Sequence, residues 1–302
     1  MPGPAAGGLS AFPLTPTSED GVDLDAFAGL VGRLAAAGVG SIGALGSTGG
    51  YVYLTRAERA RAARVAVEAA DGTPVVVGIG ALRTRDVLAL AHDAQEAGAA
   101  GVLLAPVSYQ PLTPEEVFGL YEDVTRDLSV PLCVYDNPAT TRFAFTDELH
   151  ARIAALPRVA SVKIPPVPAD PVRAAERVAA LRAVLPASVG IGVSGDPSAA
   201  AGLLAGCDLW SSVLAGVLPG PCLRLVAAAA SGSAGAARAA CAELEPVWEL
   251  FARHGSLRVV SALAQELGLV TGPDLPRPLR GLDPAARADV RRALDALGPA
   301  AR

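Results

Sequence analysis

Residues 74–107, PVVVGIGALRTRDVLALAHDAQEAGAAGVLLAPV, contain the pattern from which the fold can be predicted. Two short apolar runs, at 74–81 and 101–107, flank a stretch in which apolar residues recur every three or four positions. That spacing predicts an amphipathic helix over 84–98, and the flanking runs predict buried strands. A strand, a helix and a second strand in succession are typical of parallel strands covered by helices.

The same unit repeats along most of the chain. Eight strands separated by helices predict an α/β fold, a (β/α)8 TIM barrel, whereas a doubly wound sheet usually has fewer strands. From about residue 218 the pattern is helical, so we expect a barrel core over 1–217. The last barrel helix and a C-terminal helical subdomain would then occupy 218–302. The predicted strand regions are 8–16, 38–46, 74–81, 101–107, 131–138, 159–166, 189–195 and 207–216.

Composition excludes several classes of function. The net charge of −5 gives no basic surface for nucleic acid or an anionic membrane. No apolar run approaches the roughly 18 residues of a membrane span, and the N-terminus lacks a signal-peptide pattern. The four cysteines form no CxxC pair, so we expect no metal site and a cytoplasmic protein. Arginines in 56–64, RAERARAAR, are expected on a solvated helix face.

Reactive residues gather at the predicted carboxyl ends of four strands. They are GSTGG at 46–50, YDNP at 135–138, Lys163, and SGD at 194–196. In a parallel barrel these ends meet at one face, where the active sites of such barrels lie. The sequence therefore predicts one site at that face.

Lys163 is the most informative residue, because it is the only lysine in the chain. A lysine amine buried among apolar groups is held more readily in its neutral form, which can form a Schiff base with a ketone. Arginine cannot do this, because its guanidinium stays protonated. The alternative is a lysine in a structural ion pair, for which arginine would usually serve.

Neighbouring motifs supply groups that could assist. Tyr135 ends the adjacent strand, where its phenol could relay protons to an adduct on Lys163, or could be an ordinary buried tyrosine. The GSTGG loop offers two hydroxyls and backbone N–H groups that suit a carboxylate. Asp196 is expected to cap the following helix. His150, like the other two histidines, lies in a helical segment and is expected to be a surface or packing residue.

A motif at 38–43, GVGSIG, matches the GxGxxG pattern of dinucleotide-binding proteins. That fingerprint follows a strand and opens a helix, whereas this match follows a predicted helix and enters a strand. The hypothesis that the protein is a nicotinamide-dependent oxidoreductase rests on this match alone.

Taken in order, the motifs resemble those of the dihydrodipicolinate synthase and N-acetylneuraminate lyase superfamily of class I, Schiff-base aldolases. AFPLTP resembles the family's A-x-x-T-P opening, GSTGG its G-T-T-G-E, and YDNP its Y-N-x-P. SVKIPP is similar to the strand with I-K-[DE], GVSGD to S-G-D, and LAQELGL to the late R-x-L-G-L helix. The resemblance covers nearly the whole chain.

The resemblance implies roles for the matching positions. Lys163 would form the Schiff base with a 2-oxo acid, most often pyruvate, and Tyr135 would shuttle protons. Ser47 would be the relay hydroxyl, and Thr48 with nearby backbone amides, Gly49 among them, would bind the carboxylate. No metal or organic cofactor is implied.

The resemblance also implies contacts further from the lysine. The family's relay tyrosine, supplied across a dimer contact, corresponds to Tyr109 here, displaced by one or two residues. The family's substrate-binding arginine corresponds to Arg142, two residues late, and Ser211 is a further expected substrate contact. The partners implied are a 2-oxo acid, an aldehyde and further copies of the chain, in a dimer or tetramer.

Two departures from the family's pattern concern the second substrate. Gly50 replaces the glutamate of G-T-T-G-E, and residues 164–166, IPP, replace the acidic residue and small polar residues that follow the lysine. These changes predict a native reaction other than dihydrodipicolinate synthesis. We expect a lyase or aldolase that acts on pyruvate or another 2-oxo acid with an unidentified aldehyde partner, in the direction either of joining the two or of cleaving their adduct. The alternatives are a dehydratase acting on a sugar acid, or an inactive paralogue that binds oxo acids.

Overall fold

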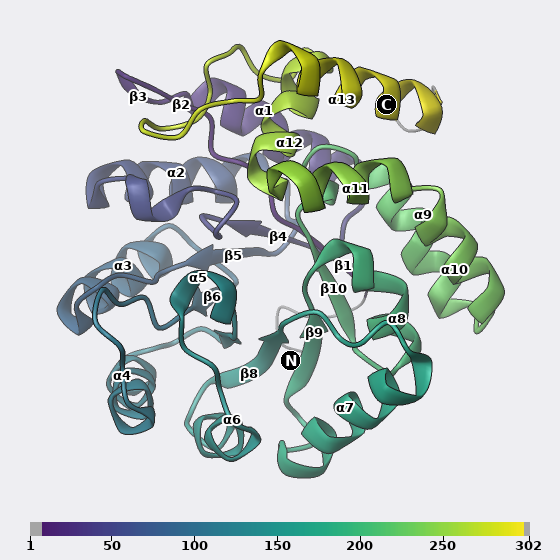
Figure 1. The fold of residues 1–302 in the computed structure, drawn as a ribbon. Coiled ribbons are helices and arrows are strands. Elements are labelled where there is room, and N and C mark those ends of the chain that lie inside the picture. The colour runs from purple at the N-terminus through teal and green to yellow at the C-terminus, as the bar shows by residue number, and fades with distance from the viewer. Residues whose placement is uncertain (1–7, 299–302) are drawn as a thin grey trace.

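The computed structural model describes residues 8–298. Within that range eight parallel strands close a barrel in the spatial order β1-β4-β5-β6-β7-β8-β9-β10, and this confirms the predicted (β/α)8 fold (Figure 1). The strands are β1 (Gly8–Ala11), β4 (Ser41–Ala44), β5 (Val75–Gly78), β6 (Gly101–Leu104), β7 (Leu132–Tyr135), β8 (Val159–Ile164), β9 (Gly190–Val193) and β10 (Leu209–Ser212).

A ring of helices surrounds the barrel, and each barrel strand is followed along the chain by a helix of this ring (Figure 1). Two of them begin with a capping box. The Thr113 side chain and Glu116 form a capping box at the start of α4, and Thr55 with Glu58 does the same for α2. The ring consists of α1 (Leu24–Ala36), α2 (Arg56–Ala69), α3 (Thr84–Glu96), α4 (Pro114–Arg126), α6 (Asp147–Ala154), α7 (Pro171–Val184), α8 (Ala199–Leu204) and α9 (Pro219–Ala230).

The C-terminal part of the chain packs as helices against one side of the barrel (Figure 1). These are α10 (Ala234–Ala242), α11 (Glu245–His254), α12 (Ser256–Glu266) and α13 (Pro284–Leu297). A hairpin of β2 (Thr17–Ser18) and β3 (Gly21–Val22) is tied to the loop before α13, because the Thr17 N–H donates to the Asp274 carbonyl at 3.0 Å. The boundary between 217 and 218 stays a prediction.

Apolar side chains fill two regions. The larger lies between the strands and the surrounding helices. A smaller cluster contains Phe12, Val76, Leu103, Ala105 and Tyr135. Phe12 and Tyr135 of this second cluster flank the Lys163 amine.

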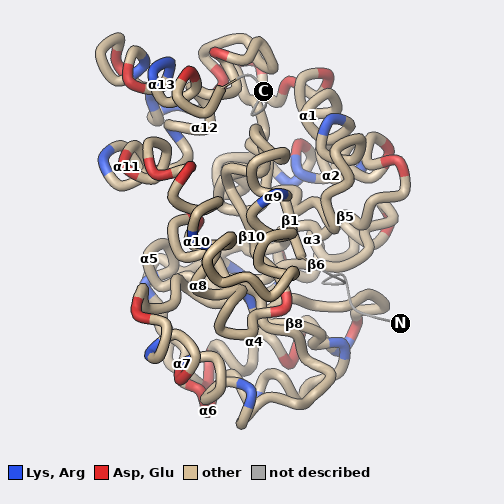
Figure 2. The backbone as a smooth tube through the Cα atoms, turned by 90° about the vertical axis from the view of Figure 1, so that its right-hand side faces the viewer, with Lys and Arg blue, Asp and Glu red and all other residues tan. Residues whose placement is uncertain are grey.

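The surface carries charges of both signs. Figure 2 shows basic and acidic positions interspersed along the outer helices on the side that it presents. Among the described helices, none is both long enough and apolar enough to pass through a membrane.

Candidate active site

Lys163 lies near the end of β8, beside Tyr135 at the end of β7. The two residues are register partners in the parallel pair, and the N–H of Asp136 donates to the Lys163 carbonyl at 3.0 Å. The lysine is only 5% exposed. The expectation that these two side chains meet at one face of the barrel therefore agrees with their positions.

The Lys163 amine is held between two aromatic rings. Its Nζ lies 3.7 Å from the centroid of Phe12 and 4.2 Å from that of Tyr135. A Cβ on Gly43 would overlap the Phe12 ring, so glycine in β4 makes room for it. In residues 8–298 Lys163 forms no salt bridge with an acidic side chain, and this disfavours a role in a structural ion pair. An amine in apolar surroundings suits nucleophilic attack on a carbonyl.

Sequence reasoning did not identify Phe12. It belongs to the AFPLTP motif, but it reaches the lysine only because the barrel closes, with β1 pairing β10 on one side and β4 on the other. Its position directly after β1 was the available signal.

The Tyr135 hydroxyl is already engaged at the barrel mouth. It accepts a hydrogen bond from Asn137 Nδ2 at 2.9 Å. Asn137 precedes the short helix α5 (Pro138–Thr141) in the YDNP motif. The amide thus orients the phenol while leaving its proton free to be donated.

The GSTGG loop is folded tightly against the ends of β4 and β5. Leu45 takes a left-handed conformation with φ of 57°, and Gly50 does so with φ of 60°. A Cβ on Gly49 would lie 3.0 Å from the Leu45 Cα, and one on Gly78 would overlap the Leu45 carbonyl. A non-glycine residue held in this region stores strain of about 1 kcal/mol or more, a feature common at functional loops. Thr48 in this loop is buried and Ser47 is half-buried.

Arg59 corrects the expectation for residues 56–64. It is buried, at 6% exposed, and donates to the carbonyls of Gly80 at 2.9 Å and Gly78 at 2.8 Å. Burial lowers its pKa to about 10. The guanidinium also lies 5.0 Å from the centroid of Tyr51, which follows the GSTGG loop. Other arginines of the stretch are exposed, so the pattern of α2 gave no sign that this one turns inward.

The other predicted substrate-binding residues differ in how far they are buried. Ser211 is buried in β10, in register with Ser10 of β1. Tyr109, after β6, is 88% exposed, and Arg142 is exposed in a left-handed turn after α5. Within one chain the structure therefore gathers Lys163, Tyr135 and the GSTGG loop at the strand ends, but leaves Tyr109 and Arg142 at the surface.

Asp196 does not cap α8, contrary to the sequence-based expectation. Its buried carboxylate accepts from Trp210 Nε1 and Ser212 Oγ, each at 3.2 Å, and from the N–H groups of Val213 and Leu214 at 3.2 and 2.7 Å. Burial raises its pKa, and these donors oppose the rise. The side chain therefore connects the end of β9 to β10 and to the turn after it, while Ser198 occupies the N-cap position of α8.

Asp136 and His150 form a buried polar pair behind the strand ends. The Asp136 carboxylate lies 3.6 Å from His150 Nε2, and the imidazole stacks on Phe145. Burial raises the pKa of Asp136 to about 7 and lowers that of His150 to about 4. His150 is thus a packing residue, as expected from the sequence.

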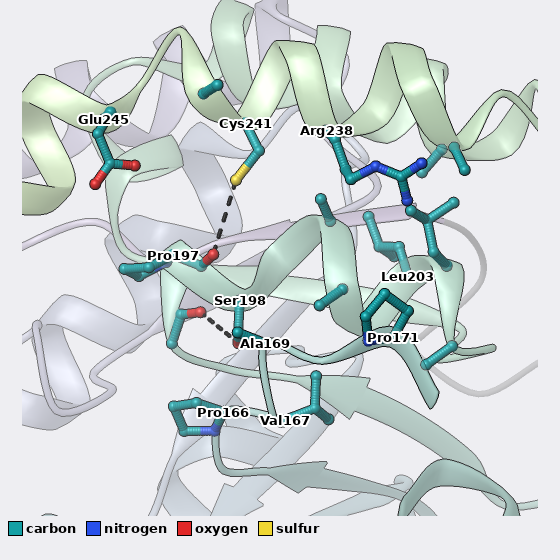
Figure 3. Close-up of a pocket in the computed structure, with 18 of the residues that line it drawn as sticks. Pro166, Val167, Ala169, Pro171, Pro197, Ser198, Leu203, Arg238, Cys241 and Glu245 are labelled. Atoms are coloured by element: carbon teal, nitrogen blue, oxygen red, sulfur yellow. Dashed lines mark hydrogen bonds between the residues drawn. The ribbon is translucent and has the colours of Figure 1, made fainter. Parts of the chain in front are cut away.

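A separate apolar groove of about 900 Å³ lies between the loop after β8, α8 and α10 (Figure 3). Pro166 and Val167 lie on one side of it, while Arg238 and Glu245 lie on the other. Cys241 borders it and donates to the Pro197 carbonyl at 3.7 Å. Gly195 of the SGD motif borders this groove, but Lys163, Tyr135 and the GSTGG loop do not.

In residues 8–298 no cluster of three or more His, Cys, Asp or Glu side chains is arranged to hold a metal ion. The cysteines Cys133, Cys207, Cys222 and Cys241 are free thiols.

The sequence matches the dihydrodipicolinate synthetase family over residues 5–297. The chain belongs to that family. It is a lyase with the fold of class I aldolases.

Known relatives resemble this chain over most of its length. A 4-hydroxy-tetrahydrodipicolinate synthase from Salinibacter ruber is 33% identical over 243 residues, 79% of this chain and 78% of that one. A crystal structure of a dihydrodipicolinate synthase from Agrobacterium tumefaciens has a TM-score of 0.93 at 48% identity, covering 97% and 99% of the two chains. A pyruvate complex of the Acinetobacter baumannii enzyme has a TM-score of 0.87 at 25% identity, covering 97% and 99%.

Proposed function

We propose that this protein is a Schiff-base-forming lyase or aldolase that acts on pyruvate or another 2-oxo acid, with an aldehyde as the second reactant. The observation that carries the proposal is the environment of Lys163. The only lysine of the chain is buried at the strand ends, with its amine between Phe12 and Tyr135. The pyruvate complex of the Acinetobacter relative supports the choice of oxo acid.

The proposed chemistry starts with addition of the Lys163 amine to the C2 carbonyl. The carbinolamine loses water as the C–O bond breaks and the C=N bond forms. Loss of a C3 proton then gives an enamine, which adds to the aldehyde carbon, and hydrolysis of the imine returns the amine. In the cleavage direction the same enamine forms when the C3–C4 bond breaks. The protonated imine accepts the electron pair, so neither a metal nor an organic cofactor is required.

The GSTGG loop would receive the carboxylate of the oxo acid. Thr48 and the backbone N–H of Gly49 would donate to it, and the Ser47 hydroxyl would pass protons to Tyr135. Ser211 would contact the substrate from β10. Tyr109 and Arg142 are exposed within one chain, so in this proposal they reach substrate only in an assembly of two or four copies. A cytoplasmic location belongs to the same proposal.

The second reactant would differ from that of dihydrodipicolinate synthases. A Cβ on Gly195 would overlap the Pro166 ring, so the IPP segment packs directly on the loop after β9. Residues 164–166 are apolar, whereas the family pattern that the sequence resembles has an acidic residue and small polar residues after the lysine. A dehydratase acting on a sugar acid would use the same imine and remains the alternative for the native reaction.

Borohydride trapping tests the proposal. Incubation with pyruvate and borohydride should add one reduced pyruvate to the peptide that contains Lys163, as seen by mass spectrometry. Absence of this adduct with pyruvate and with other 2-oxo acids would refute the proposal. An adduct without deuterium exchange of the pyruvate methyl protons would instead identify an inactive oxo-acid-binding paralogue. A panel of 2-oxo-acid aldol adducts then identifies the aldehyde.

A further inference from the structure

We propose that Phe12 is a catalytic residue of the Lys163 site, because the face of its ring stabilises the positive charge of the protonated imine. The inference rests on the proposed function, since the imine forms on Lys163 only if that proposal holds. It adds a group that carries neither a proton nor a hydrogen bond, and that acts on the reacting nitrogen directly.

Two ring faces enclose the nitrogen that would become the imine. Lys163 Nζ lies 3.7 Å from the centroid of Phe12 and 4.2 Å from that of Tyr135. Both distances are well within the range of about 6 Å over which the face of an aromatic ring attracts a cation. The two rings thus form an aromatic cage around the nitrogen, and the Phe12 ring is the nearer one.

The cage holds the nitrogen without covering it. Among residues 8–298 the Lys163 amine forms no hydrogen bond and no salt bridge, yet Nζ is not one of the fully enclosed polar atoms without a partner. The nitrogen therefore still meets accessible space, from which a carbonyl carbon can approach it. Within the described chain, the two rings are the groups that contact a positive charge at this position.

The titratable groups near the nitrogen supply no compensating negative charge. Besides the phenol of the cage, β7 presents the Cys133 thiol, whose pKa is raised by burial while Lys163 opposes the rise. That thiol stays neutral. On the other side of β8, Gly192 of β9 is the register partner of Lys163 and carries no charge. The Asp136 carboxylate lies beside His150, behind the strand ends.

The Phe12 ring is fixed in its position by the strand beside it. A Cβ on Gly43 would overlap the ring, and one on Gly46 would lie 2.8 Å from Phe12 Cδ1. The backbone is held as well, because the Phe12 N–H donates to the Ser212 carbonyl at 2.9 Å. The ring face is therefore in place before any charge develops, as electrostatic stabilisation requires.

The charge appears when the carbinolamine loses water. The nitrogen lone pair forms the C=N bond as the C2–O bond breaks, and the departing oxygen takes one proton and leaves as water. The nitrogen keeps its own hydrogen and becomes positive. It then accepts the electron pair that the C3–H bond releases, which an unprotonated imine does poorly. Because the ring face attracts the charged form and not the neutral one, the imine should keep its proton to higher pH.

The test changes the electron density of the ring and leaves its shape nearly intact. Phenylalanines with one, two and three ring fluorines replace Phe12, and each fluorine weakens the attraction of the ring face for a cation. Deuterium exchange of the pyruvate methyl protons is measured against pH at saturating pyruvate, where the rate reports ionisation in the enzyme–substrate complex. The alkaline fall in rate should move to lower pH with each fluorine, by about 0.4–1.5 pH units in total.

Two leucine variants complete the comparison. Phe12→Leu removes the ring and should move the alkaline fall as far as three fluorines do. Phe27→Leu removes an equally buried ring from the larger apolar region and should leave the alkaline fall at its wild-type pH. Asp136 ionises near pH 7 in every one of these proteins, so it produces no difference between them.

The outcomes separate this inference from the proposed function. Labelling of Lys163 by pyruvate and borohydride in each fluorinated protein shows that the site is folded. An alkaline fall that stays at the same pH through the fluorine series would overturn the role of Phe12, even if Phe12→Leu moved it, because packing alone would then explain the leucine variant. Absence of any adduct in the wild-type protein would instead defeat the proposed function itself.

Discussion

Lys163 shows at the scale of one residue why charge and reactivity are separate properties. Arginine would keep a positive group between Phe12 and Tyr135, but its guanidinium stays protonated and cannot form an imine. Every other residue in the chain's total of lysine and arginine is arginine. A lysine here is therefore best explained by its nucleophilic amine.

Lys163→Arg should accordingly abolish the reaction. We expect no borohydride-stable pyruvate adduct at position 163 and no exchange of methyl protons above the rate without enzyme. Lys163→Met, which keeps an unbranched side chain without charge, is the matched control for loss of positive charge. An active Lys163→Arg protein would show that the reaction does not pass through an imine at this position.

At the scale of elements, Asp196 holds the ends of β9 and β10 together. Asp196→Ala would leave four donors without their acceptor, and each buried unsatisfied group costs about 1–3 kcal/mol. We expect the free energy of unfolding to fall by about 3 kcal/mol or more, measured by urea denaturation. Asp170→Ala, which removes an exposed cap of α7, should cost about 1 kcal/mol. Equal losses in the two variants would show that the four hydrogen bonds of Asp196 contribute no more than one helix cap.

The loop after β9 and the loop after β8 are fitted to each other at Gly195. This residue has φ of 79°, and a Cβ there would overlap Pro166. Gly195→Ala should lower the free energy of unfolding by about 2 kcal/mol and raise KM for the second reactant, because the IPP segment must shift. Gly232→Ala provides the control, since Gly232 has φ of 77° and open space around it. An unchanged KM in Gly195→Ala would separate this segment from substrate binding.

For the whole molecule, the fold followed from the sequence more fully than the site did. The barrel was predictable because strand and helix periods are local, and the pairing of Tyr135 with Lys163 follows once both residues end adjacent parallel strands. Phe12 and Arg59 were missed because their roles depend on contacts between distant segments. In the sequence Arg59 looks like the exposed arginines of α2, and only the folded structure shows that it donates to the carbonyls of Gly78 and Gly80.

The stability of the whole molecule should depend on the ionisation of Asp136. Burial raises the pKa of this carboxyl to about 7 from its ordinary 3.8, with Arg177 opposing the rise and Asp147 adding to it. The folded protein thus keeps a proton that the unfolded chain releases near pH 4. This contribution to stability is fully present below pH 4 and is lost as the pH rises to about 7.

Asp136→Asn removes this dependence, because an amide stays neutral at every pH. The free energy of unfolding of the wild type, minus that of Asp136→Asn, should therefore fall as the pH is raised from 4 to 7 and level off above. Urea denaturation at a series of pH values measures it. Burial lowers the pKa of His150 to about 4, so its contribution to stability is lost in the opposite direction, as the pH falls from 6.5. His150 is present in both proteins, so this contribution does not enter the difference between them. Asp170→Asn controls for the loss of one carboxylate, and a pH-independent difference for Asp136→Asn would mean that the buried carboxyl is ionised throughout this range.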